Sequence, residues 1–254
     1  MSQSVEERER AFFDRHYQEV VRNPAGFALR VRREFAALRR LTGRRRLGRL
    51  LSVGCGEGPF ECLLAPHAES VLGIDVSNAA IDGARNRAAA GGLTNLEFRC
   101  QAVSALDPDE RFDGIASVAF LHHVAAADLP RLLADLGARL RPGGFLFAQE
   151  PSRRGFLRAL GRRVLGASYD RYHSEDEREL DPDELTRELR AAGLGRIEID
   201  WIDVTLIPGQ YAFPRAPSGL MQAFAVLDRV YCATPLARWA SSFTVFATRS
   251  EDPT

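Results

Sequence analysis

The turn Gly54-Cys55-Gly56-Glu57-Gly58 follows an apolar run and places three glycines within five residues. Because glycine has no Cβ, such a turn lets its backbone approach a ligand closely. Asp75 follows about twenty residues later, at the end of a second apolar run, where a carboxylate can accept hydrogen bonds from ribose hydroxyls. Together these residues predict a binding site for a cofactor that carries a nucleoside.

The spacing of the glycines narrows the kind of cofactor. A dinucleotide fingerprint reads G-x-G-x-x-G, and Pro59 stands where its third glycine would be. Pro59 suits the first turn of a following helix instead. The chain also has no G-x-x-x-x-G-K-S/T motif, so a phosphate-binding P-loop is excluded.

An alternating series of strands and helices must position these residues. Strands separated by helices pair in parallel with right-handed crossovers, and ligands bind at the carboxyl edge of such a sheet. The sequence therefore predicts a doubly wound α/β fold. Hydrophobic periodicity predicts strands at 49–53, 70–75, 95–100, 112–118, 144–150, 196–206 and 242–249, and helices at 59–66, 77–90, 127–140, 152–165 and from Asp181-Pro182 onward, with two more within 5–40.

Four sequence blocks carry a resemblance to a known family. They read, in order, LLSVGCGEG, VLGIDVS, RCQAVSALDPDERFDGIASVAFLHHV and LRPGGFLFAQEP. In this order they resemble the class I S-adenosylmethionine-dependent methyltransferases of the small-molecule type, over roughly residues 47–150 and more loosely to the C-terminus. The chain departs from the family at Ser52 and Gln101, where an acidic residue is usual.

The resemblance implies a Rossmann-like sheet of seven strands, the last of them antiparallel. It also implies an N-terminal helical lid over 1–46 and a methyltransferase domain over 47–254. The segments 151–180 and 207–240 are expected to be cap or substrate insertions, the second of them helical and placed between the last two strands. Since a long connection in a compact domain usually has a function, we expect substrate selectivity to reside in 207–240.

The cofactor that the resemblance implies is S-adenosyl-L-methionine, with S-adenosyl-L-homocysteine as the product. Its contacts are expected from backbone near the methionine moiety, from Asp75 at the ribose and from residues around the adenine. Carried over position by position, the expected cofactor-binding residues are Tyr17, Ser52, Gly54, Cys55, Gly56, Asp75, Val76, Gln101, Ala102, Val103 and Ala119.

Methyl transfer to a hydroxyl also needs a base that removes the proton of the acceptor. His122 and His123 follow the fourth predicted strand, and Glu150 ends the fifth. In this fold those strand ends are neighbours, so one histidine could be oriented by Glu150. Adjacent histidines are expected to point in different directions, so that at most one faces the substrate, and His173 is a third candidate. A purely structural role for one histidine remains an alternative.

Several motifs of other methyltransferases are absent after the fourth strand. Ser117-Val118-Ala119-Phe120 contains neither the D/N-P-P-Y/F/W motif of amino-methylating DNA enzymes nor a nucleophilic cysteine. It also lacks the carboxylates with which catechol-type enzymes hold magnesium. We therefore expect no metal in the site.

The composition limits the partners. The formal net charge is +0, which argues against nucleic acid as the default partner.

Four cysteines without a C-x-x-C pair are typical of reduced thiols in a cytoplasmic protein. The basic amphipathic segment 152–165 could contact an anionic membrane surface, although a solvated surface helix is the commoner case. The insertion 207–240 could alternatively form a homodimer face.

The favoured prediction is O-methylation of a small hydrophobic or aromatic metabolite with a His/Glu base; N- and C-methylation remain open. A lipid-linked acceptor is an alternative, as is RNA, for which the arginine cluster at 39–49 could bind phosphates. The remaining alternative is a catalytically inactive interaction module with the same fold.

Overall fold

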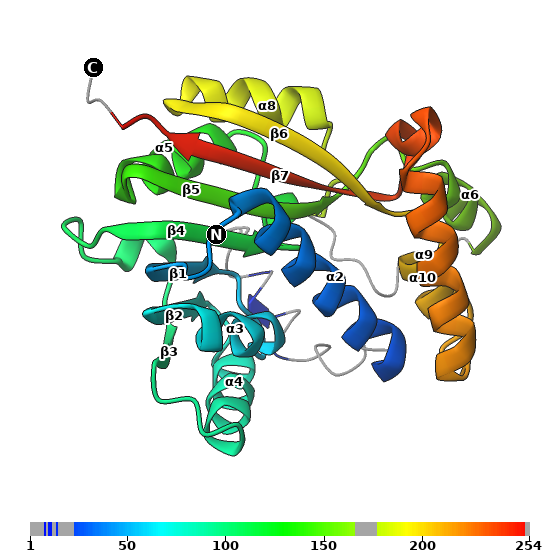
Figure 1. The fold of residues 1–254 in the computed structure, drawn as a ribbon, viewed down its shortest axis with the longest axis horizontal. Coiled ribbons are helices and arrows are strands. Elements are labelled where there is room, and N and C mark those ends of the chain that lie inside the picture. The colour runs from blue at the N-terminus through cyan, green and yellow to red at the C-terminus, as the bar shows by residue number, and fades with distance from the viewer. Residues whose placement is uncertain (1–7, 9, 12–13, 15–22, 166–176, 252–254) are drawn as a thin grey trace.

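The computed structural model describes residues 8, 10–11, 14, 23–165 and 177–251. Their centre is one seven-stranded sheet in the order β3-β2-β1-β4-β5-β7-β6 (Figure 1). β7 runs antiparallel to both β5 and β6, and the other pairs are parallel. This arrangement confirms the predicted Rossmann-like sheet with an antiparallel last strand. The strands are β1 Arg49–Val53, β2 Ser70–Asp75, β3 Leu96–Cys100, β4 Phe112–Val118, β5 Leu140–Pro151, β6 Leu194–Asp203 and β7 Ser242–Arg249.

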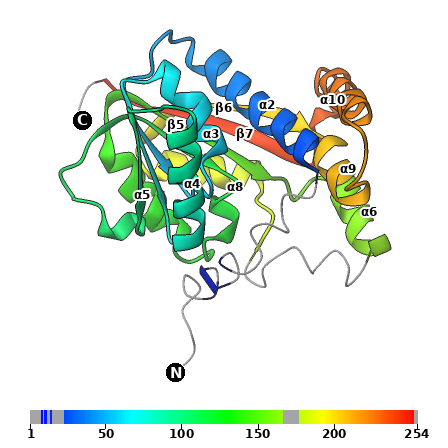
Figure 2. The same cartoon turned by 90° about the horizontal axis from the view of Figure 1, so that it is seen from below.

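Helices cover both faces of the sheet (Figures 1 and 2). One apolar core joins the sheet to α5 and α8, and a second joins it to α2 and α3. The strand order reverses between β1 and β4, so the turns after these strands open a crevice at the carboxyl edge. The helices are α2 Pro24–Thr42, α3 Pro59–Leu64, α4 Asn78–Ala90, α5 Leu129–Arg139, α6 Phe156–Leu165, α8 Pro182–Ala191, α9 Leu206–Ala212 and α10 Ser218–Cys232.

Local capping explains where several helices begin. Pro59 and Pro182 are first residues of α3 and α8, as the sequence predicts. The carboxylate of Asp181 accepts from the backbone N–H groups of Asp183 (2.9 Å) and Glu184 (3.3 Å), so it caps α8.

Three predicted boundaries are wrong. The helix expected at 127–140 ends at Arg139, and β5 already begins at Leu140, where the ladder with β4 is irregular. The strand expected at 196–206 ends at Asp203 because α9 begins at Leu206. The helix expected at 152–165 begins only at Phe156, since Ser152 forms a β-bridge with Leu180.

The insertion between β6 and β7 contains α9, α10 and a short 3-10 helix over Pro235–Trp239. Asp228 of α10 is fully buried and accepts from the backbone N–H groups of residues 204–206. Arg33 of α2 pairs with the same carboxylate at 2.8 Å. The insertion is therefore fixed to both the sheet and α2. Among the helices that the structure describes, none is long and apolar enough to cross a bilayer.

Candidate active site

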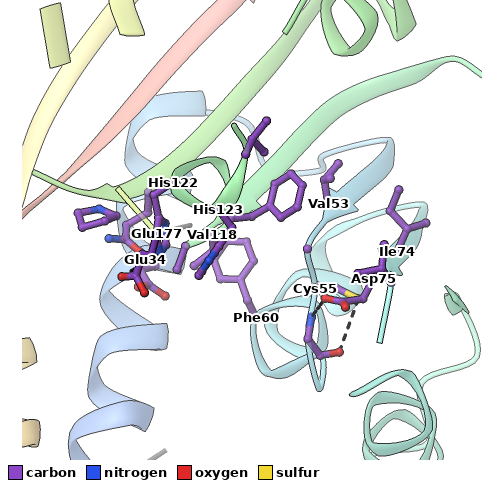
Figure 3. A pocket seen from close by; sticks show the side chains of 18 of the residues that line it. Glu34, Val53, Cys55, Phe60, Ile74, Asp75, Val118, His122, His123 and Glu177 are labelled. Atoms are coloured by element: carbon purple, nitrogen blue, oxygen red, sulfur yellow. Dashed lines mark hydrogen bonds and ion pairs between the residues drawn. The ribbon is translucent and has the colours of Figure 1, made fainter. Parts of the chain in front are cut away.

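A cavity of about 650 Å³ lies at the carboxyl edge of the sheet (Figure 3). Its walls come from the turns after β1, β2, β3 and β4, from α2 and α5, and from α9 of the insertion. A volume of this size is typical of a small-molecule site. The cavity therefore joins the predicted cofactor turns to segments that lie far away in the sequence.

One end of the cavity is formed by the turns that follow β1 and β2. Gly54 and Gly56 adopt left-handed backbone conformations with φ of 67° and 53°. Asp75 Oδ2 accepts from the Gly56 N–H (2.9 Å), and Oδ1 accepts from the Ser77 N–H (2.9 Å). Burial raises the pKa of Asp75, and these backbone donors oppose that effect. We call this region the donor end.

Most of the predicted cofactor-binding residues line the cavity. The exceptions are Ser52, which does not line the cavity, and Tyr17, which lies outside the described residues. Asp14 is described, and its carboxylate accepts a hydrogen bond from the Ser77 hydroxyl beside Asp75. The predicted residues that line the cavity are Gly54, Cys55, Gly56, Asp75, Val76, Gln101, Ala102, Val103 and Ala119.

Ser52 has a different role from the expected one. It is buried, and its hydroxyl donates to the carboxylate of Glu61 from α3. Glu61 lines the cavity, and its other oxygen is buried without a hydrogen-bond partner. Burial raises the pKa of Glu61 to about 7, and the Ser52 hydroxyl opposes this. A carboxyl group from α3 thus lines the cavity beside Ser52, the position where the family usually has an acidic residue.

The opposite end of the cavity contains the histidines, and we call it the acceptor end. The turn begins at Ala119, a non-glycine residue in the left-handed region (φ 55°), which costs on the order of 1–2 kcal/mol. The fully buried carboxylate of Glu150 accepts from the backbone N–H groups of Phe120 (3.3 Å), Leu121 (2.9 Å) and His122 (3.3 Å). Glu150 therefore holds a strained turn in place.

Glu150 also orients one of the two histidines. His122 Nδ1 lies 2.7 Å from Glu150 Oε2, so His122 rather than His123 forms the pair that the sequence left open. Burial raises the pKa of Glu150 to about 8, and the backbone donors of the turn oppose this effect. Glu150 does not line the cavity, whereas His122 does. The Glu150 carboxyl group thus acts on the cavity through the imidazole of His122.

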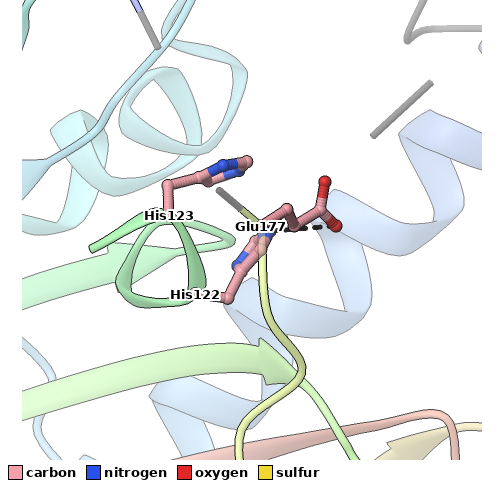
Figure 4. Close-up of side chains that lie close together, drawn as sticks. All are labelled: His122, His123 and Glu177. Carbon is pink, nitrogen blue, oxygen red and sulfur yellow. Dashed lines mark ion pairs between the residues drawn. The ribbon is translucent and has the colours of Figure 1, made fainter. Parts of the chain in front are cut away.

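The expectation that at most one histidine faces the substrate is wrong. His122 and His123 both line the cavity, with ring centroids 4.0 Å apart. The 3-10 turn over Leu121–His123 directs both side chains to the same side. Glu177 joins them, with Oε1 3.6 Å from His122 Nε2 (Figure 4). His173 lies outside the described residues.

Besides Glu61 and Glu177, sequence reasoning missed Glu34, Gln149 and Gln210 among the polar side chains that line the cavity. Glu34 of α2 is fully buried, and its Oε1 lies 3.2 Å from Arg30 Nε. When the side-chain amide of Gln149 is flipped, its nitrogen donates to the same Glu34 oxygen at 3.1 Å and its oxygen accepts from the Glu150 N–H at 3.3 Å. Gln210 of α9 is buried, and its amide nitrogen has no hydrogen-bond partner. The sequence does give one indication for Glu34: a charged residue stands on the apolar face of a predicted helix, between Val31 and Leu38.

Many arginines of the predicted basic surfaces are paired within the chain. In α6 and just before it, Arg158 pairs with Glu179 (3.4 Å) and Arg154 with Asp181 (3.0 Å). Phe156 and Leu160, the expected apolar face, are exposed by 46% and 53%. In the cluster at 39–49, Arg40 pairs with Asp200 and Arg49 with Glu110. These pairs reduce the positive charge available to a phosphate-rich partner.

Comparisons with known proteins agree with this geometry. Residues 25–198 match a family model described as a methyltransferase domain. The ubiquinone biosynthesis O-methyltransferase of Coxiella burnetii (strain Dugway 5J108-111) is 31% identical over 172 residues, which cover 65% of this chain and 71% of the relative. That of Chelativorans sp. (strain BNC1) is 35% identical over 152 residues, or 58% of each chain. The structure of magnesium protoporphyrin IX methyltransferase from Synechocystis PCC 6803 with bound SAH has a TM-score of 0.65 at 15% identity, covering 97% of this chain and 100% of that one.

Proposed function

Because the chain belongs to the family of class I S-adenosylmethionine-dependent methyltransferases, we propose that it methylates a hydroxyl oxygen of a small molecule. It is an enzyme whose methyl donor is S-adenosyl-L-methionine. The relatives above are named O-methyltransferases, which supports oxygen as the receiving atom.

The donor end of the cavity fits this donor. S-adenosylmethionine carries an electrophilic methyl group on a positively charged sulfur, and it has ribose hydroxyls. Asp75, which is only partly buried, suits the ribose hydroxyls, and the buried carboxyl group of Glu61 suits the cation and still has an oxygen without a partner. A Cβ at position 54 would lie 2.6 Å from the Phe120 Cβ, so only glycine leaves the turn its present shape. Gly54, Gly56, Asp75 and Glu61 would hold the donor.

The observation that carries the proposal is the pair of His122 and Glu150. Burial favours the neutral form of Glu150, and three backbone N–H donors favour its ionised form. The proposed reaction uses the state in which Glu150 is ionised and the shared proton lies on His122 Nδ1. His122 Nε2 is then a proton acceptor that faces the cavity. A positioned base of this kind contributes typically about 10²–10⁴-fold to such a reaction. The remaining acceleration comes from holding acceptor and donor in line.

Selection of the acceptor is assigned to α2 and α9. Glu34, Gln210 and Ile207 line the cavity from these two helices, and Asn23 at the start of α2 donates to Ala216 O of the insertion (3.1 Å). The two helices thus form one wall of mixed polarity. This arrangement supports the insertion 207–240 as the substrate cap and the N-terminal segment as a lid over the donor.

A methyl-transfer assay tests the proposal. Purified enzyme is given S-adenosylmethionine with a labelled methyl group and a panel of matched phenols, aliphatic alcohols and amines. We expect transfer to a hydroxyl, and we expect His122→Gln to lower kcat by about 10²-fold or more without changing donor affinity. His67→Gln, a change at a histidine outside the cavity, is the matched control. Transfer to amines alone, or full turnover in His122→Gln, contradicts the proposal.

A further inference from the structure

Three side chains of the acceptor end bring potential metal ligands together. His122 and His123 each offer a ring nitrogen and Glu177 offers a carboxylate oxygen, and these atoms all lie within 4.8 Å of one another (Figure 4). His122 Nε2 and Glu177 Oε1 are 3.6 Å apart. Two ligands bound to one ion at about 2.1 Å are separated by about 3.3–3.6 Å at tetrahedral to trigonal angles. One pair therefore already has the spacing of ligands on a common ion.

His122 has the second contact that metal-binding histidines usually make. Its Nδ1 lies 2.7 Å from the buried carboxylate of Glu150, on the side of the ring away from Glu177. In metal sites such a carboxylate fixes the ring and makes its other nitrogen a better ligand. Glu150 is itself held by three backbone N–H groups, so this support is rigid. The arrangement matches a carboxylate–histidine–metal series.

The groups around the cluster suit a bound cation. Carboxyl groups flank His122 on both sides, since Glu150 Oε2 lies 2.7 Å from Nδ1 and Glu177 Oε1 lies 3.6 Å from Nε2. The ring centroids of His122 and His123 are 4.0 Å apart, so both imidazoles can reach one ion. Arg158 is closer to Glu179 (3.4 Å) than to Glu177 (4.0 Å).

We propose that His122 Nε2, His123 and Glu177 bind one divalent transition-metal ion, with its remaining positions open to the acceptor end of the cavity. Two imidazoles and one carboxylate form a three-ligand set of the kind found in catalytic zinc sites. Nitrogen ligands favour zinc or cobalt over magnesium, which prefers oxygen. A hydroxyl of the acceptor can occupy an open position, where the ion lowers its pKa and its proton passes to water.

This inference replaces the expectation of a metal-free site. That expectation considered only carboxylates directly after the fourth strand, and none is present there. The proposed ligands come from the end of that turn and from Glu177, more than fifty residues further along the chain. Binding of the ion does not depend on the proposed function. Its role in ionising the acceptor rests on the proposed O-methylation, and there the ion takes the place of His122 as the activating group, because a metal-bound Nε2 cannot accept a proton.

Metal titration of the untagged protein, without donor or acceptor, tests the site. The metal-free protein is titrated with Zn²⁺ by calorimetry and with Co²⁺ by visible absorption, and Mg²⁺ serves as the oxygen-preferring comparison. We expect one ion per chain and a Co²⁺ spectrum with the intensity of a four- or five-coordinate site. Glu177→Gln and His123→Ala should each weaken binding at least tenfold, and Glu150→Gln about tenfold through the second contact of His122.

A matched control separates this site from incidental binding. His67→Gln removes a histidine outside the cavity and should bind the ion as the unchanged protein does. Absence of one-to-one binding below about 100 µM would overturn the site. An affinity for the metal ion that stays the same in Glu177→Gln and His123→Ala would also overturn the site.

A final comparison separates this proposal from the proposed function. Methyl transfer is measured on metal-free enzyme and after addition of one equivalent of Zn²⁺ or Co²⁺. Stimulation by the ion, lost in Glu177→Gln, supports its role in ionising the acceptor. If the metal-free enzyme turns over at the full rate, that role is rejected while O-methylation stands. If an ion binds but no hydroxyl is methylated under any condition, the site stands and the proposed function fails.

Discussion

The two ends of the cavity are built in different ways. The donor end consists of consecutive backbone turns and the carboxyl groups of Glu61 and Asp75, all of which lie within about two strand–helix units. The acceptor end takes His122 from the turn after β4, Glu177 from the segment before α8, and Gln210 from the insertion. One end is local in sequence, and the other is assembled by the tertiary fold.

This difference follows from what each end must recognise. A donor shared by a whole family can be held by backbone geometry, which depends on glycine and on strand positions. An acceptor differs between enzymes, and side chains on separate helices can change without disturbing the sheet. The following changes probe the two ends separately, beginning with the largest expected effect.

Gly54→Ala should nearly abolish donor binding. The residue has φ of 67°, and an added Cβ would lie 2.4–2.6 Å from side-chain atoms of Phe120. Strain and overlap together cost on the order of 3 kcal/mol, which corresponds to a loss of affinity of about 100-fold or more. Calorimetry with S-adenosylmethionine measures this loss.

Gly92→Ala is the matched control for Gly54. It has nearly the same backbone angle, φ 63°, but a Cβ there would meet nothing within 4 Å. It carries the backbone strain without the overlap, and it lies outside the cavity. Equal losses of donor affinity in both variants would show that general destabilisation, not the shape of the turn, is responsible.

Asp75→Asn should weaken donor binding by about 30-fold, or about 2 kcal/mol, since hydrogen bonds to charged groups are worth about 1.5–3 kcal/mol. The asparagine oxygen can still accept one of the two backbone N–H groups that now reach Asp75. Thermal denaturation of the donor-free protein should therefore change less than donor affinity. An unaltered affinity for S-adenosylmethionine would remove Asp75 from the donor site.

The same contrast explains what the sequence could predict. The alternation of strands and helices, the glycine turn and Asp75 follow from local patterns, because hydrophobic periodicity and glycine spacing can be read directly from the sequence. The pairing of Glu150 with a histidine was predictable as one of two options, since neighbouring strand ends meet. The choice of His122 depends on a 3-10 turn that no pattern indicates.

The missed residues reach the cavity from other elements. Glu177 comes from a segment after α6, and Glu61 comes from α3, where it accepts a hydrogen bond from Ser52. No spacing rule connects these positions, because their proximity arises only when the helices pack on the sheet. Buried charges on otherwise apolar helix faces, as at Glu34, are the one signal that a sequence offers for such residues.

Glu61→Gln should remove a pH dependence from the donor end. The folded-state pKa of Glu61, about 7, lies above its usual value of 4.5 because of burial. Its contribution to the stability of the donor-free protein is thus fully present below about pH 4.5 and is lost as the pH rises through about 7. From pH 6 to pH 8 this loss amounts to about 1.4 kcal/mol.

Donor affinity should change in the opposite direction. A positively charged donor favours the ionised Glu61, so affinity should rise about tenfold from pH 6 to pH 8. Glu61→Gln should flatten both profiles, measured by denaturant titration and by calorimetry at each pH. Profiles that keep their slopes in this variant would assign the pH dependence to another group.

Gln210→Met should give the smallest effect, and it concerns the acceptor end alone. The amide nitrogen of Gln210 is buried without a hydrogen-bond partner, so the protein tolerates an unsatisfied donor that an acceptor molecule can satisfy after a side-chain rotation. Methionine keeps the volume and removes this donor. Loss of one neutral hydrogen bond, about 1 kcal/mol, should raise the KM for the acceptor about fivefold while donor affinity is unchanged. The melting temperature should hold or rise, because an unsatisfied buried donor is removed.

Val226→Ala on the exposed face of α10 serves as the control. A Gln210→Met enzyme that loses stability with no change in the KM for the acceptor would show that this amide serves packing rather than recognition.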